Sequence, residues 1–193
     1  MKRVLVIALA AVLIPTLALA QLTQAGSPLR TTSAKIANAI LAAPTTISAN
    51  ATILDWPAKE GDAPAVLRAG TNGWSCFPDY PMTEGNDPMC VDSVWTDFFG
   101  ALMAHKPPTV SRVGIAYMVA PGGAWGSNTD PYASKQAPDN EWGFDPPHVM
   151  IAVPDTKALE GLPTKRQGSQ PWVMFAGTPY AHIMVPVVEG KKP

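Results

Sequence analysis

The chain has 193 residues, of which 47% are hydrophobic and only 15% are charged, whereas about a quarter of the residues in an ordinary globular domain are charged. The 14 basic and 15 acidic residues argue against a nucleic-acid partner, which would require a basic patch. The apolar content argues against a disordered chain, and the 21 prolines predict a fold with many turns.

The first twenty residues have the features of a secretory signal peptide. Lys2 and Arg3 precede an apolar run, and Ala18-Leu19-Ala20 is a small-residue cleavage site. The run is too short to span a membrane, which takes about 20 apolar residues, and no later segment approaches that length. We therefore expect a periplasmic or secreted protein with no transmembrane segment after signal cleavage.

The remaining chain has the length of one domain. We expect a flexible lead-in at residues 21–33, a single domain at 34–188 and a frayed polar C-terminus at 189–193. Residues 32–43 contain helix formers with an apolar stripe and are followed by Pro44, so they predict a short N-terminal helix.

Residues 51–56 and 65–69 are strand candidates separated by a turn, and residues 74–77, which contain the first of two cysteines, extend into the loop between them. An even number of cysteines in an exported chain predicts a disulfide, here between Cys76 and Cys90. The alternative, a redox-active or metal-binding pair, usually has C-x-x-C spacing, which is absent.

The strongest helical pattern follows the second cysteine. Asp87 is a suitable N-cap and Pro88 suits the first helical position, so we expect a long amphipathic helix at about 88–104. His105 then lies at its C-terminal end, where a positive charge interacts favourably with the helix dipole. The apolar stripe of this helix consists of Val91, Val94, Trp95, Phe98, Phe99 and Leu102.

Residues 112–120 predict a largely buried strand, and the long stretch at 121–147 reads as an irregular loop. Loops of this length are often functional. Trp125 and Trp142 lie in it among several carboxylates, which suits the wall of a pocket for a polar small ligand such as a sugar or an amine. The alternative is a surface loop held in place by its aromatic residues.

One pattern occurs twice in the last third of the chain, in PHVMIAVP at 147–154 and in HIMVPV at 182–187. Both are alternating, β-branched runs that predict strands, and each carries a His two positions before a Met. Because residues i and i+2 share a face of a strand, the two His-x-Met pairs are expected on one surface if the strands pair. The aliphatic residues on the opposite faces are expected to form the core; they are Val149, Ile151, Val153, Ile183, Val185 and Val187.

A helical turn at 156–160, a strand at 172–175 and a turn at 177–179 connect these two strands. Helices do not alternate regularly with strands, which argues against a parallel doubly wound sheet. We therefore expect an α+β fold, with a mainly antiparallel sheet of about five to six strands packed against the helix at 88–104 and the short N-terminal helix.

The strings TNGWSC, NDPMC, GIAYM, PPHVM and PYAHIMVP resemble those of a group of small secreted bacterial proteins of unknown function. The resemblance covers most of the chain after the signal peptide. It implies export and a single domain, and it implies no activity.

No nucleophile elbow, P-loop, zinc-protease, EF-hand or haem-attachment motif is present. This favours a non-enzymatic module of the bacterial envelope that binds a small molecule or another exported protein. Its predicted ligand-binding residues are Trp125, Trp142, Tyr180, His148 and His182.

Two alternatives remain open. Copper would suit His148, Met150, His182 and Met184, because imidazole and thioether ligands favour Cu(I), provided that the two strands are adjacent and in register. A hydrolase would use His148 or His182 as a general base, with Asp145, Asp155 or Tyr180 as its partner.

Overall fold

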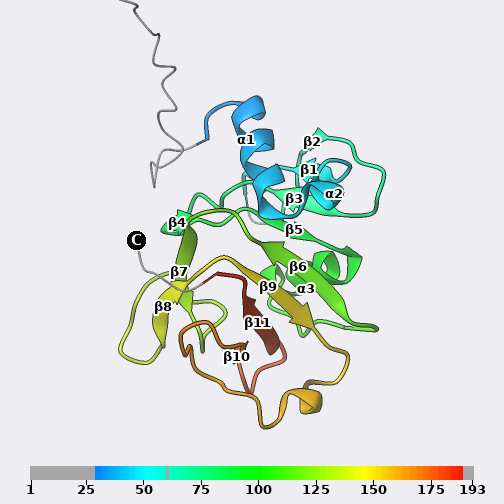
Figure 1. The fold of residues 1–193 in the computed structure, drawn as a ribbon. Coiled ribbons are helices and arrows are strands. Elements are labelled where there is room, and N and C mark those ends of the chain that lie inside the picture. Colours follow the sequence, from blue (N-terminus) through cyan, green and yellow to red (C-terminus); the bar gives the residue numbers. More distant parts are fainter. Residues whose placement is uncertain (1–28, 60, 189–193) are drawn as a thin grey trace, which may run out of the picture.

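The computed structural model describes residues 29–59 and 61–188 (Figure 1). Its helical elements are α1 (Thr32–Ala39), η1 (Ile40–Ala42), α2 (Thr45–Ser48), α3 (Ser93–Met103) and η2 (Thr156–Leu159). Its strands are β1 (Thr52–Leu54), β2 (Val66–Arg68), β3 (Ser75–Phe77), β4 (Gly85–Asn86), β5 (Met89–Val91), β6 (Gly114–Met118), β7 (Gly123–Ser127), β8 (Trp142–Asp145), β9 (His148–Ala152), β10 (Trp172–Met174) and β11 (His182–Pro186).

The predicted signal peptide, most of the predicted lead-in and the predicted frayed C-terminus lie outside the described residues. Within the described part of the chain, no helix is long and apolar enough to cross a membrane.

The strands form two sheets, which lie side by side in Figure 1. The larger has eight strands in the order β10-β11-β9-β6-β5-β3-β1-β2, and the smaller has three in the order β4-β7-β8. The larger sheet is mixed, because β1 runs parallel to β3. The expected architecture, a mainly antiparallel sheet of five to six strands on one long helix, is therefore wrong.

The expected helix at 88–104 is wrong at its beginning. Residues Met89–Val91 form β5, a fully buried strand that pairs with β3 on one side and with β6 on the other. The helix α3 begins only after Asp92, whose side chain accepts a hydrogen bond from the Trp95 amide at 3.0 Å. Asp92 is thus the N-cap in place of Asp87, and α3 has only 11 residues.

The main core lies between α3 and one face of the larger sheet. Val94, Trp95 and Phe98 of α3 are buried there, so this part of the apolar stripe does face the core. The buried residues of this cluster are Phe77, Met89, Val91, Trp95, Phe98, Ala116, Met150, Ala152, Trp172, Met174, Tyr180 and Met184.

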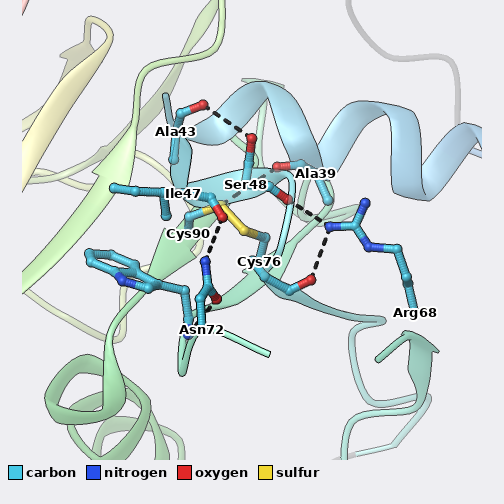
Figure 2. Close-up of a disulfide and its surroundings, with 10 residues drawn as sticks. Ala39, Ala43, Ile47, Ser48, Arg68, Asn72, Cys76 and Cys90 are labelled. Atoms are coloured by element: carbon cyan, nitrogen blue, oxygen red, sulfur yellow. Dashed lines mark hydrogen bonds between the residues drawn. A yellow bond between two sulfur atoms is a disulfide. The ribbon is translucent and has the colours of Figure 1, made fainter. Parts of the chain in front are cut away.

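A second apolar cluster lies on the other face, beneath the N-terminal helices, and contains the disulfide (Figure 2). Cys76 and Cys90 are directly opposite each other on β3 and β5 and are bonded, as predicted. Arg68 fixes the overlying backbone by donating to the carbonyls of Ser48 and Ala51 at 2.6 and 2.9 Å. The disulfide therefore joins two central strands beneath α1, η1 and α2.

The stretch at 121–147 is not wholly irregular. It contains β7 and β8, which pair antiparallel and form most of the smaller sheet. The two strands include three glycines and only one short aliphatic residue, Ala124, so they lack the β-branched pattern by which strands are usually recognised.

Candidate functional site

The two His-x-Met segments form neighbouring strands, β9 and β11, that pair antiparallel. Met150 is directly opposite Met184, whereas His148 is opposite Pro186. The two histidines therefore lie at opposite ends of the paired segment, four residues apart along the strands, or about 13 Å at the usual rise per residue. The strands are adjacent, but their register does not gather the two imidazoles and two thioethers at one point.

The His-Met face is buried, contrary to the expected arrangement. His148, Met150, His182 and Met184 are each at most 4% exposed and face the α3 side of the sheet. The aliphatic residues on the opposite face, including Ile151 and Val185, are only half-buried. Both histidines are therefore interior residues: His182 packs beneath Trp95 and Phe98 of α3, and His148 lies further along the same face of the sheet.

Among the described residues, both imidazoles form hydrogen bonds with the backbone alone. The Nδ1 of His148 lies 2.6 Å from the Pro146 carbonyl, and that of His182 lies 2.9 Å from the Tyr180 carbonyl. A carbonyl can only accept, so Nδ1 carries the proton in each ring. Burial lowers the pKa of both histidines, that of His182 to about 4, so both are neutral near pH 7.

The surroundings of the two rings do not resemble a catalytic dyad. Neither Nε2 atom has a hydrogen-bond partner among the described residues. The His182 ring packs edge-on against Trp95, with ring centroids 5.1 Å apart. Asp155 caps η2 instead, by accepting from the Lys157 amide at 3.0 Å. Asp155, one of the three proposed partners of a histidine base, is therefore engaged elsewhere.

No group of three or more His, Cys, Asp or Glu side chains in residues 29–59 and 61–188 is arranged to hold a metal ion. Together with the separation of the two His-x-Met pairs, this leaves the copper alternative without a preformed ligand set.

Tyr180 is also a core residue, only 5% exposed. Its hydroxyl donates to the Lys106 carbonyl at 2.9 Å and therefore accepts from the Tyr132 hydroxyl at 2.6 Å. This hydrogen bond is the main cause that raises the pKa of Tyr132 to about 12. Tyr180 thus anchors the 128–141 loop to the end of α3 rather than lining a site with the two tryptophans.

Trp125 and Trp142 are brought together. Trp125 is directly opposite Phe144 on the neighbouring strand, and Ser127 is directly opposite Trp142. Because cross-strand partners and residues i and i+2 share a face, all four side chains project from one face of the smaller sheet. We call this surface the aromatic face; both of its tryptophans are half-buried, whereas Ser127 and Phe144 beside them are buried.

The opposite face of the same hairpin is held by an ion pair between the half-buried Arg166 and the buried Asp145. Arg166 donates to both carboxylate oxygens of Asp145 at 2.6 and 3.0 Å, and it also donates to the Glu141 and Gly126 carbonyls. The side chain covers Gly143, where an added Cβ would lie 3.1 Å from the guanidinium. This bidentate contact makes the hairpin a rigid support for the aromatic face.

An exposed carboxylate adjoins the aromatic face. The Trp125 amide donates to the Glu84 carbonyl at 2.9 Å, so Glu84 lies on the chain that borders β7. Glu84 is exposed to solvent. The face therefore combines two indole rings with a neighbouring negative charge.

Sequence reasoning missed a pair of carboxyl groups, Asp79 and Asp87. The antiparallel register of β3 and β5 pairs Phe77 with Met89, and its continuation by two residues sets Asp79 opposite Asp87. The Asp87 amide donates to Asp79 Oδ1 at 2.8 Å, and the Tyr80 amide donates to Asp87 Oδ1 at 3.0 Å. Burial, followed by a hydrogen bond to the Asp87 carboxyl, raises the pKa of Asp79 to about 7.

A signal for this pair exists in the sequence. From Cys76 forwards the sequence is Cys-Phe-Pro-Asp, and from Cys90 backwards it is Cys-Met-Pro-Asp. The two segments differ in one apolar residue only. A disulfide between directly opposed strand positions would therefore also oppose the two aspartates.

An open hollow of about 580 Å³ lies between η2 and the turn that joins β10 to β11. None of the predicted ligand-binding or metal-ligating residues lines it.

No model of a known protein family, no curated protein and no solved structure matches this chain, so its function has to be argued from the residues above.

Proposed function

We propose that this chain is an exported, non-enzymatic binding module, periplasmic or secreted, that recognises a small polar ligand on its aromatic face. The observation that carries the proposal is the register of β7 and β8, which sets Trp125 and Trp142 on one half-buried face. The disulfide supports export, because such bonds persist in oxidising compartments.

The chemistry of the face favours a ligand with one apolar or cationic side. Indole rings bind cations through their π faces, and tryptophan is the strongest of the aromatic residues in this respect. The exposed Glu84 beside Trp125 would favour a positive group in the same place. A sugar, with its apolar ring face and polar rim, or an organic amine therefore fits best.

The support beneath the face favours binding over mere packing. Arg166 and Asp145 hold the hairpin from the other side, so little conformational entropy would be lost when a ligand binds. The buried histidines and Tyr180 contribute to the fold and not to the proposed surface.

Isothermal titration with glucose, N-acetylglucosamine, choline and putrescine tests the proposal. We expect at least one of these probes to bind, and Trp125→Ala and Trp142→Ala each to weaken it about tenfold, or about 1.4 kcal/mol. Trp74→Ala is the matched control, because Trp74 is also half-buried but packs at a tilt against Tyr117 of the larger sheet, with ring centroids 5.6 Å apart. Absence of binding by all four probes, or equal weakening by the control, would contradict the proposal.

A further inference from the structure

Residues 78–88 form a loop closed twice at its base. The Cys76–Cys90 disulfide joins the two strands that flank it, β3 and β5. Two residues beyond the ends of these strands, within the loop, the Asp79 and Asp87 carboxyls face each other. Asp87 is 8% exposed and Asp79 is half-buried. Each carboxyl accepts a hydrogen bond from a backbone amide of the opposite arm, Asp79 from the Asp87 amide and Asp87 from the Tyr80 amide.

Two ionised carboxylates in directly opposed positions would repel each other. A proton shared between them removes one charge and supplies a hydrogen bond. The Asp79 pKa, raised to about 7 by burial and by the Asp87 carboxyl, is the expected result of this arrangement.

Within residues 29–59 and 61–188, no positively charged group is among the causes that shift the Asp79 pKa. From α1, the neutral Asn38 accepts from the Asp79 amide at 2.7 Å. From β9, His148 is close enough for Asp87 to influence its pKa, but burial keeps its ring neutral. From β8, the Asp145 carboxylate is already paired with Arg166, and Glu84 within the loop adds a further negative charge.

The loop carries β4, the edge strand of the smaller sheet. Gly85 and Asn86 of β4 pair with Ala124 and Gly123 of β7. Asn86 also accepts from the Asn38 side chain at 2.8 Å. The position of β4 against β7 therefore depends on how firmly the two arms of the loop are held together.

We propose that Asp79 and Asp87 form a proton-operated latch, in which the shared proton holds the 78–88 loop closed and its loss frees β4 from β7. The latch stands on these contacts alone and does not depend on the ligand proposed above. Because β4 borders Trp125, opening of the latch alters one edge of the aromatic face.

Hydrogen exchange of the loop amides at pH 5.5 and 8.5, each corrected for the intrinsic exchange rate, tests the latch. In the wild type, protection of the Tyr80, Asn86 and Asp87 amides is expected to fall about tenfold at the higher pH. A difference of about one unit between the pKa of Asp79 in the closed loop and in the open loop would produce this change. Amides of β9, in the centre of the larger sheet, serve as the internal reference and should keep their protection.

Asp79→Asn retains an oxygen acceptor and adds an N–H donor for Asp87, so it should keep the loop closed at both pH values. Asp97→Asn on the exposed side of α3 is the matched control and should behave as the wild type. Equal protection at both pH values in the wild type would overturn the proposal. So would a tenfold loss that persists in Asp79→Asn, whose native fold circular dichroism would verify.

Discussion

Met150 and Met184 lie directly opposite each other on β9 and β11, and both are buried against α3. This relationship makes them packing residues, since their thioethers face the core and the nearest histidines lie further along each strand in opposite directions. A swap of buried methionine for leucine conserves volume and usually costs less than about 1.5 kcal/mol.

We therefore expect the double substitution Met150→Leu and Met184→Leu to lower the free energy of unfolding by less than about 3 kcal/mol, measured by urea denaturation. Titration of the wild type with Cu(I) under reducing conditions should show no stoichiometric binding. Micromolar binding that disappears in the double variant would instead establish the copper site.

The N-cap at Asp92 offers a second test, of where the helix begins. Asp92 accepts from the Trp95 amide at 3.0 Å with one oxygen and from the Ile115 amide at 3.1 Å with the other. Asp92→Ala leaves both amides without these acceptors and should cost about 2 kcal/mol of stability. Asp97→Ala, at an exposed position of the same helix, should change stability by less than about 0.5 kcal/mol. Similar denaturation midpoints for the two variants would contradict the assignment.

Loss of the disulfide should be costly because it joins β3 and β5 near the centre of the larger sheet. Replacement of both Cys76 and Cys90 by Ser is expected to lower the free energy of unfolding by about 2 to 5 kcal/mol, as is usual for small secreted domains. The far-ultraviolet circular dichroism at low temperature should remain close to that of the wild type. An unchanged melting curve would show that the cysteines contribute nothing to stability.

The buried His182 predicts a loss of stability in acid. Its pKa in the folded protein is about 4, below the ordinary value of 6.5. As the pH falls from 6.5 to 4, His182 is protonated in the unfolded chain but remains neutral in the folded chain. The free energy of unfolding therefore decreases over this pH range. Over that window the effect amounts to about 3 kcal/mol.

Asp79 acts in the opposite direction over the same window, because its raised pKa lets the folded protein take up the proton first. The two effects partly cancel in the wild type. The stability of His182→Leu therefore has to be compared with that of the wild type at the same pH, where both proteins carry the Asp79 effect. The destabilisation caused by His182→Leu should be about 3 kcal/mol smaller at pH 4 than at pH 7. A difference that does not vary with pH would mean that His182 titrates normally.

Some of the fold follows from local pattern. The alternation in β9 and β11 identifies both strands, and the spacing of Val94, Trp95 and Phe98 identifies α3. The two-residue period of side chains along a strand does not by itself reveal which face is buried when both faces are apolar. The sequence pattern therefore does not show that the His-Met face is the buried one, with Met150 and His182 packed against α3.

Other features depend on contacts that the sequence does not display. Val91 fits the helical stripe by spacing, yet the ladder with β3 and β6 makes it a strand residue. In the hairpin of β7 and β8, Gly143 leaves room for Arg166 and Gly123 has a φ of +86°, and these glycines weaken the strand signal. The Asp79–Asp87 pair becomes visible only when the disulfide is understood as a cross-strand contact.

Nuclear magnetic resonance of the indole N–H groups tests the central claim, that the aromatic face binds a ligand, most directly. The six tryptophans give separate signals, and Trp125→Phe and Trp142→Phe assign the two on the aromatic face. On titration with the probe that binds best among the sugars and amines above, the Trp125 and Trp142 signals are predicted to shift together and saturably. The signals of Trp74 and Trp95 should not move, since both rings lie elsewhere. Shifts confined to tryptophans outside the aromatic face, or none at millimolar probe, would contradict the account.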